Sequence, residues 1–381
     1  MTAATPLTGI ETPALLLDLA TFDRNVARLR RHLDALGVSF RPHVKTAKSI
    51  DLARRLFPDG TGPITVSTLA EAEYFADGGI TDITYAVGLA PEKIARARAL
   101  VARGVSLGVL IDSIEQAHAL ADAAADGAAM PGVLIEIDCD GHRGGLLPHD
   151  ATIVAIADRL RAGGVALLGV LTHAGESYNA RGGVGLPEMA EAERAAAVAA
   201  AGLLRDAGHA CPVVSVGSTP TAHFARDLTG VTEVRAGVFM FFDLVMRGIG
   251  VCTLDDIAVS VLATVIGHRA DKGWILTDAG WMAMSRDRGT QKHPVDQGYG
   301  LVCAMDGTPF PDLIVGDASQ EHGILTVRPG SGATLPDLPV GSRVRILPNH
   351  ACATSAQHDR YHVLDDGGTR VAAILPRIRG W

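Results

Sequence analysis

Short apolar runs and longer amphipathic segments alternate along the chain up to about residue 250. The amphipathic segments have apolar residues at helical spacing, and several end at a glycine, as helix C-termini commonly do. Apolar strands that alternate with helices are typical of a parallel sheet covered on both faces. The predicted strands are VSFRPHV (38–44), ITVST (64–68), DITYAV (82–87), SLGVLID (106–112), VLIEID (133–138), LLGVLTH (167–173), VVSVGS (213–218) and EVRAGVF (233–239).

Eight such strands favour a closed (β/α)8 barrel over residues 20–250, and a doubly wound open sheet is the alternative. After Gly250 the pattern changes to short β-type runs separated by Gly, Pro and Asp turns, which predicts an antiparallel β domain at the C-terminus. The run TPALLLDL (12–19) is also strand-like, and it precedes a predicted helix over 20–36. The pattern leaves open whether this first strand begins the barrel or joins the β domain.

Composition excludes several classes of protein. The chain has 381 residues, 48% of them hydrophobic and 20% charged, so we expect a large buried core and little disorder. A formal net charge of −8 argues against nucleic-acid binding. We see no secretory signal, and no apolar run reaches the ~20 residues of a membrane span. The 5 cysteines are scattered without a CxxC pair, which indicates a reduced, cytoplasmic protein.

Polar residues follow most of the predicted strands, at the end of a barrel where enzymes carry their chemistry. Lys45 is the most suggestive of them, because burial at a strand end would disfavour its ammonium form. A Schiff base with a carbonyl cofactor would remove that charge. A lysine in an ion pair or at the surface is the simpler interpretation, and position alone favours it. The residues at these ends are His43, Lys45, Ser67, Thr68, Arg143, His173, Tyr178, Ser218, Thr219 and Arg235.

Two glycine-containing segments end the last two predicted strands. GSTPT (217–221) offers backbone N–H groups, hydroxyls and a helix N-terminus, and RAG (235–237) offers a glycine that permits close approach. Barrels often bind phosphate at these two strands, so the pair indicates a phosphate site. Either glycine alone fits an ordinary tight turn.

The β domain contains the segment LPNHACAT, with His350 and Cys352 two residues apart. In extended backbone this spacing would place both side chains on one face. An imidazole and a thiolate favour zinc, and two ligands leave coordination positions for water or substrate. A core cysteine beside a surface histidine is the alternative. His322, in SQEHG, is a candidate base, a third ligand or a simple loop residue.

Taken together, these segments resemble a known family. PHVKTAK, GHRGG, LTHAG, SVGSTPT, EVRAG, DAGW, QEHG and PNHACAT occur in this order along essentially the whole chain. The sequence is similar to the fold-type III, alanine-racemase-like enzymes that use pyridoxal 5'-phosphate (PLP), and more narrowly to the group of D-serine dehydratases and D-threonine aldolases. The resemblance implies a barrel over 20–250, a β domain formed by 1–19 and 251–381, and a homodimer.

The resemblance also implies roles for individual residues. Lys45 would carry PLP, and Arg235 would face its pyridine nitrogen. His350 and Cys352 would bind a divalent metal, with zinc favoured over magnesium or manganese. The phosphate ligands would be Ser218, Thr219, Gly237 and Val238. The residues lining the catalytic pocket would be His173, Tyr178 and Arg143.

The activity that the resemblance implies is a dehydration of D-3-hydroxy amino acids, foremost D-threo-3-hydroxyaspartate to oxaloacetate and ammonia, and also D-serine to pyruvate. Lys45 would remove the α-proton, and the metal would assist departure of the β-hydroxyl. Retro-aldol cleavage, as in D-threonine aldolases, is the first alternative, although those relatives tend to carry aspartate where Cys352 stands. Racemisation would leave the metal pair unused. A non-catalytic PLP carrier would lack the β domain. The cations available for a second substrate carboxylate are Arg286, Arg288, Lys292 and His322.

Overall fold

The structure, a computed structural model, describes residues 4–381 and divides into two compact units. The barrel unit comprises Arg28–Ala180, Val184–Gly237 and the last two residues. The β unit combines the N-terminal segment up to Ala27 with Arg181–Gly183 and Val238–Arg379. The sequence-based domain limits at residues 20 and 250 stay a prediction, and residues 1–3 lie outside the described part of the chain.

In the described chain, the barrel unit holds an 8-stranded parallel sheet in the order β3-β10-β9-β8-β7-β6-β5-β4. A bridge between His43 and Thr65 joins the segment after β3 to β4. The N–H of Thr65 donates to the carbonyl of Pro42, and the N–H of Val44 donates to that of Thr65, both at 2.9 Å. These contacts close the ring and confirm the predicted barrel. The strands are β3 (Ser39–Phe40), β4 (Ile64–Val66), β5 (Asp82–Gly88), β6 (Ser106–Ile111), β7 (Gly132–Ile137), β8 (Leu167–Thr172), β9 (Val213–Val216) and β10 (Glu233–Val234).

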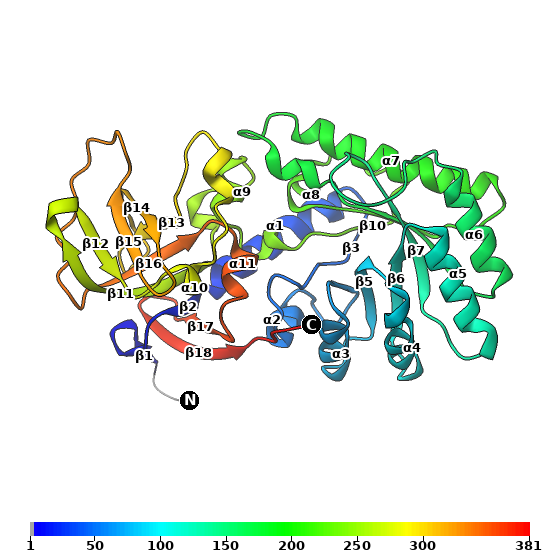
Figure 1. The fold of residues 1–381 in the computed structure, drawn as a ribbon, viewed down its shortest axis with the longest axis horizontal. Helices are drawn as coiled ribbons and strands as arrows, with labels where there is room; N and C mark the ends of the chain where they lie inside the picture. The colour runs from blue at the N-terminus through cyan, green and yellow to red at the C-terminus, as the bar shows by residue number, and fades with distance from the viewer. Residues whose placement is uncertain (1–3) are drawn as a thin grey trace. The chain divides into compact units, whose positions relative to one another are not determined.

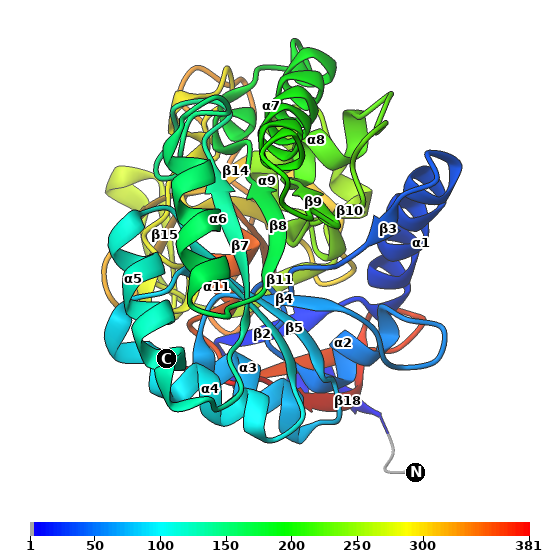
Figure 2. The same ribbon diagram turned by 90° about the vertical axis from the view of Figure 1, so that its right-hand side faces the viewer.

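Helices cover the outside of this sheet, and Figures 1 and 2 show α3 to α7 around the strands. Local sequence signals set where several of them begin. Thr68 and Ser113 cap α3 and α5 by accepting a backbone N–H three residues on. The helices are α1 (Leu19–Ala35), α2 (Ile50–Arg55), α3 (Leu69–Asp77), α4 (Ile94–Ala102), α5 (Ile114–Ala123), α6 (Thr152–Ala162), α7 (Leu186–Asp206) and α8 (Thr219–Phe224).

The β unit contains, among residues 4–381, a 10-stranded sheet in the order β1-β18-β17-β2-β11-β12-β15-β14-β13-β16. A further antiparallel pairing between β11 and β16 closes the strands from β11 to β16 into a small barrel, which confirms the predicted antiparallel domain. The strands are β1 (Thr5–Pro6), β2 (Ala14–Leu17), β11 (Val259–Arg269), β12 (Trp274–Thr277), β13 (Gly300–Cys303), β14 (Pro309–Ala318), β15 (Gly323–Val327), β16 (Arg343–Pro348), β17 (Arg360–Leu364) and β18 (Arg370–Pro376). Its short helices are α9 (Leu244–Gly248), α10 (Trp281–Met284) and α11 (Ala351–Ser355).

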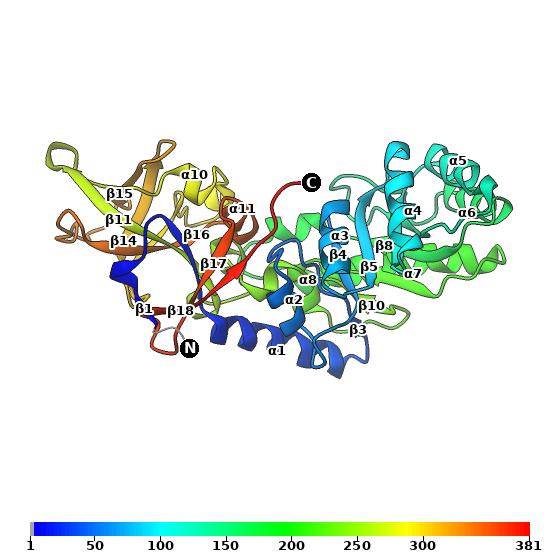
Figure 3. The same ribbon diagram turned by 90° about the horizontal axis from the view of Figure 1, so that it is seen from below.

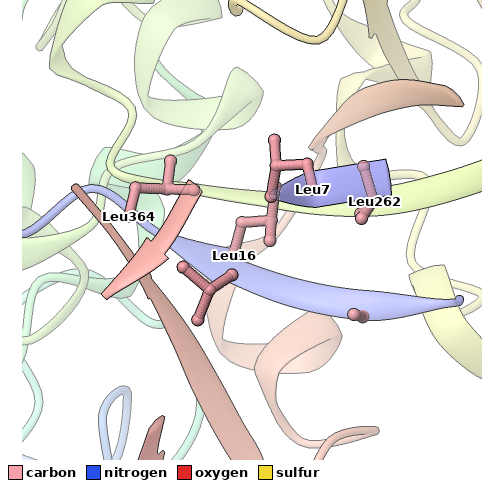
Figure 4. Packing of buried hydrophobic residues seen from close by; sticks show 6 residues of the cluster. Leu7, Leu16, Leu262 and Leu364 are labelled. Atoms are coloured by element: carbon pink, nitrogen blue, oxygen red, sulfur yellow. The ribbon is translucent and has the colours of Figure 1, made fainter. Parts of the chain in front are cut away.

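The N-terminal strand β2 belongs to the β unit, as the family resemblance implied. It pairs antiparallel with β11 and parallel with β17. Figure 3 shows β17 and β18 side by side, and β1 pairs with the outer edge of β18. Leu7, Leu16, Leu262 and Leu364 belong to one buried cluster that joins the first residues of the chain to the later strands (Figure 4). Among the described residues, no helix combines the length and hydropathy of a membrane span.

Candidate active site

The segment after β3 carries two lysines whose surroundings differ. Lys48 forms an ion pair with Glu71, with Nζ 2.9 Å from Oε1, and the Glu71 side chain is fully buried. Lys45 is exposed and has no carboxylate partner among the described residues. The expectation that Lys45 is buried is therefore wrong, and the surface position that the simpler interpretation allowed is the one observed. An amine without a carboxylate partner is chemically suited to hold an aldehyde such as PLP.

Two half-buried histidines lie within electrostatic reach of Lys45. Burial lowers the pKa of His43 well below its ordinary value, and the charges of Lys45 and Arg235 add to the shift. Burial likewise lowers the pKa of His173 to about 3, and the charges of Arg143, Lys45 and Arg235 contribute. Both rings are therefore neutral at neutral pH. Nδ1 of His173 lies 2.8 Å from the carbonyl oxygen of Gly217, so Nδ1 donates its proton and Nε2 keeps a lone pair.

The depressed pKa of His173 predicts a loss of stability in acid. Below its ordinary value of about 6.5, the unfolded chain binds a proton that the folded chain excludes until about pH 3. The free energy of unfolding should therefore fall as pH drops through this window. In His173→Gln, urea unfolding of the apoprotein should show a pH dependence smaller by up to about 2 kcal/mol between about pH 6.5 and about pH 5. The exposed His268 provides the control His268→Gln, and equal pH slopes in both variants would contradict the assignment.

Arg235 is fixed inside the barrel. Its Nη1 donates to Ser215 Oγ and its Nη2 donates to the carbonyl of Thr172, both at 2.6 Å. Burial lowers the pKa of Arg235 to about 10, against the opposing charges of Glu233, Glu193 and Glu136. The guanidinium therefore stays charged at neutral pH and cannot move freely. This immobility suits a residue that faces one atom of a bound ring, as the resemblance implies.

The predicted phosphate segment opens helix α8. Ser218 is its N-cap, because its Oγ accepts the N–H of Thr221 at 3.2 Å and also lies 2.8 Å from Ser177 Oγ. The N–H of Thr219 donates to the hydroxyl of Tyr178 at 3.3 Å. Gly217 has φ +147°, and an added Cβ would lie 1.8 Å from the carbonyl oxygen of Arg235. The glycine is thus required where two strand ends meet, whatever binds nearby.

The remaining predicted site residues take the following places. A Cβ on Gly237 would approach the carbonyl oxygen of His43 to 3.0 Å. Val238 is buried and begins a 3₁₀ turn of the β unit. Arg143 is exposed, with Nη2 3.6 Å from Glu136 Oε1. The ring of Tyr178 lies 6.0 Å from that of His173.

Glu193 of α7 is a site residue that the sequence reasoning missed. Its carboxylate accepts the backbone N–H of Ala174 and of Gly217, both at 2.9 Å. It also accepts the hydroxyl of Thr221 at 2.6 Å. The N–H of Gly217, expected to face a phosphate, is therefore already bonded to a side chain.

In the β unit, His350 and Cys352 do not lie on an extended strand, so the expectation of one strand face is wrong. His350 is the N-cap of α11, and Cys352 lies in its first turn. A side-chain hydrogen bond nevertheless links the two. Although burial lowers the pKa of His350, the charge of Cys352 and the hydrogen bond that the ring donates to Asp287 raise it well above its ordinary value. Among the described residues, no group of three or more His, Cys, Asp or Glu side chains is arranged to hold a metal.

Asp287, which the sequence analysis also missed, contacts the His350 ring of this pair. Its Oδ2 lies 2.6 Å from Nδ1 of His350. Asp243, fully buried, accepts the N–H of Ala351 at 2.9 Å and so holds the backbone between the two side chains. A histidine whose Nδ1 bonds a carboxylate presents Nε2 outward, as metal-binding histidines usually do. An imidazole, a thiol and this support fit a divalent ion with open positions.

Replacing Asp287 with alanine should weaken metal binding about 10- to 100-fold, because His350 would lose the contact that fixes its ring and tautomer. Competition with a chromogenic chelator would measure the affinity. Asp271→Ala is the matched control, since this exposed aspartate of the same unit pairs with Arg269. An unchanged affinity in Asp287→Ala would contradict the role given to Asp287.

The basic residues considered as partners of a second substrate carboxylate differ in their contacts and exposure. Arg288 pairs with Asp296 at 2.7 Å. Arg286 is exposed, with its guanidinium 5.2 Å from the centre of the Trp281 ring. Lys292 and His322 are exposed.

Comparison with known proteins identifies the family. The family profile described as "Alanine racemase, N-terminal domain" matches residues 17–245, and the profile described as "Putative serine dehydratase domain" matches 258–364. The D-threo-3-hydroxyaspartate dehydratase of Delftia sp. (strain HT23) is 51% identical over 380 residues, which cover 98% of this chain and 99% of that protein. The D-threonine aldolase of Arthrobacter sp. is 32% identical over 376 residues, which cover 95% of this chain and 91% of the relative.

A solved structure gives the same result for the fold. The structure of D-threo-3-hydroxyaspartate dehydratase from Delftia sp. HT23 matches with a TM-score of 0.95 and 50% identity, covering 99% of this chain and 100% of that chain. The barrel and the second domain of serine dehydratase type thus agree with the comparisons. The chain belongs to the alanine-racemase-like, fold-type III family of PLP enzymes.

Proposed function

We propose that the protein is a PLP- and metal-dependent dehydratase of D-3-hydroxy amino acids, acting foremost on D-threo-3-hydroxyaspartate to give oxaloacetate and ammonia, and also on D-serine to give pyruvate. The observation that carries the proposal is the full-length identity of 51% to a D-threo-3-hydroxyaspartate dehydratase. The carboxylate-supported pair of His350 and Cys352 adds chemistry that such a reaction uses.

In this proposal Lys45 would hold PLP and would accept the α-proton of the substrate as general base. PLP supplies an electron sink for the negative charge that develops at the α-carbon. A charged guanidinium such as Arg235 would donate a hydrogen bond to a pyridine nitrogen without transferring its proton, so the nitrogen would stay unprotonated and this sink would be weak. Arg143 and Tyr178 would orient the substrate beside the neutral His173. Phosphate binding would fall to Ser218, Thr219, Gly237 and Val238.

With a weak electron sink, less negative charge can accumulate at the α-carbon before the β-hydroxyl leaves, so assistance to the leaving hydroxyl would matter more. His350 and Cys352 would hold the divalent ion, and such an ion supplies a Lewis acid for the hydroxyl. We propose zinc, because imidazole and thiolate ligands suit it best. We also propose a cytoplasmic homodimer. The cytoplasm is supported by the free thiols of all described cysteines, and the dimer by the family resemblance.

Purified enzyme should be incubated with D-threo-3-hydroxyaspartate, D-serine and D-threonine, with and without a chelator. We expect oxaloacetate and ammonia from the hydroxyaspartate, slower release of pyruvate from D-serine, and loss of both activities with the chelator. Glycine and an aldehyde as the main products would overturn the proposal.

Retro-aldol cleavage is the second candidate, favoured by the 32% identity to a D-threonine aldolase. It shares fold and cofactor but requires deprotonation of the β-hydroxyl and cleavage of the Cα–Cβ bond. The thiol of Cys352 weighs against it, since the aldolases tend to carry an aspartate there. A non-catalytic PLP carrier is disfavoured by the serine dehydratase domain over 258–364.

A further inference from the structure

Glu193 occupies a position of α7 where the sequence calls for an apolar residue. It lies on the buried stripe of the helix with Leu186, Ala190 and Ala197. Its side chain is only 2% exposed, and among the described residues it has no cationic partner within ion-pair distance. A buried carboxylate is costly unless hydrogen bonds compensate it. Its presence on this stripe therefore requires a specific set of partners.

Those partners come from three separate elements. Oε1 accepts the N–H of Ala174, which follows β8, and the N–H of Gly217, which follows β9. Oε2 accepts the hydroxyl of Thr221 in the first turn of α8. One carboxylate thus ties together two strand ends and the start of a helix. A leucine in its place would leave two buried N–H groups without an acceptor, which is unfavourable in the protein interior.

Each of these contacts lies next to a residue assigned to the cofactor. Ala174 follows His173, and Gly217 precedes Ser218 and Thr219. Ser218 and Thr219, the residues assigned to the phosphate, therefore lie between Gly217 and Thr221, both of which are bonded to Glu193. The orientation of these two residues depends on the backbone that Glu193 fixes.

We propose that Glu193 is a positioning residue for the phosphate group of PLP. It holds the segment 217–221 and the end of β8 in the phosphate-binding geometry before the cofactor arrives, so that binding does not have to order them. The inference rests on PLP being the cofactor of this chain. The proposed role concerns binding of the phosphate group, and binding of the ring and the aldehyde of PLP should be unaffected.

The test compares the affinities of the apoprotein for PLP and for pyridoxal, which lacks the phosphate. Glu193→Leu should weaken PLP binding about 10- to 100-fold, because two backbone N–H groups and one hydroxyl would lose their acceptor, and leave pyridoxal binding unchanged. Glu193→Gln should restore most of the PLP affinity, because its amide oxygen can still accept both N–H groups. Glu191→Leu is the matched control, since Glu191 is exposed on the same helix and pairs with Arg194.

Equal losses of PLP and pyridoxal affinity in Glu193→Leu would overturn the proposal, because they would indicate a general structural role. Unchanged PLP affinity in that variant would overturn it as well. If Glu193→Leu does not fold, Thr221→Val removes one of the three contacts and should show a smaller loss that is again specific to PLP. Failure of the unaltered protein to bind PLP at all would overturn the cofactor assignment together with this proposal.

Discussion

Lys45→Ala is expected to lower the rate of dehydration at least about 1,000-fold, within the range that a general base contributes. It should also remove the visible absorbance of protein-bound PLP, because no other amine at the strand ends is without a partner in the described chain. The two effects have one cause, since the same nitrogen carries the cofactor and takes the α-proton. Steady-state ammonia release and the absorption spectrum of the dialysed protein would measure them.

Lys48→Arg is the control for this experiment. Lys48 lies three residues from Lys45 in the same segment, and arginine can keep the ion pair with Glu71. This variant should retain both the absorbance and most of the activity. If the absorbance of bound PLP survived in Lys45→Ala but was lost in Lys48→Arg, the cofactor would be bound to Lys48, and the assignment to Lys45 would be wrong.

Cys352→Ala is expected to lose bound metal and at least about 100-fold of the dehydratase rate, because the β-hydroxyl would leave without a Lewis acid. Metal content of the purified protein and the rate with added zinc would be measured together. Absorbance of bound PLP should be unchanged, since Lys45 still holds the cofactor. A normal rate in this variant would remove the metal from the mechanism.

Cys303→Ala is the matched control for the metal experiment. Cys303 forms no disulfide, is buried in strand β13 of the same unit, and lies outside the segment 350–352. Its replacement should leave metal content and rate unchanged. If both cysteine variants lost metal equally, the effect would reflect a general weakening of the β unit rather than the loss of a ligand.

The sequence was sufficient for the barrel because most of its strands are apolar enough to be recognised alone, although β3 (Ser39–Phe40) and β10 (Glu233–Val234) occupy only two residues of the longer predicted runs. Two strands of the β unit are harder to recognise in the sequence. The strand β13 (Gly300–Cys303) follows a glycine-rich stretch that resembles a turn, and β18 (Arg370–Pro376) is largely exposed and contains two alanines. The hydrophobic pattern of β2 does not show which strand it pairs with. Its partners β11 and β17 lie far away in the sequence, and pairing between such distant strands depends on the whole fold.

The site was predicted less completely, because its supporting residues look ordinary in the sequence. Asp287 stands in the charged run SRDRG, where nothing marks it as a partner of His350. Glu193 lies in a helix rich in Ala and Glu, where glutamate is a common surface residue. One signal was available, since Glu193 falls on the apolar stripe with Leu186 and Ala190. Lys45 was selected because it was expected to be buried, and His350 and Cys352 because they were expected to lie in extended backbone. The structure shows neither feature, and the proposed roles of these residues stay predictions.

The pairing of β2 bears on how the chain folds during its synthesis. The apolar residues Ala14–Leu17 leave the ribosome early, but their nearest partner Val259 follows Leu17 by about 242 residues (259 minus 17). At a synthesis rate of roughly 5–20 residues per second, β2 waits about 12–48 s for β11, and longer for β17. The barrel strands, whose partners are mostly neighbours in sequence, can assemble during that time. A nascent chain stopped before residue 259 should therefore expose an unpaired apolar strand to chaperones while its barrel is already forming.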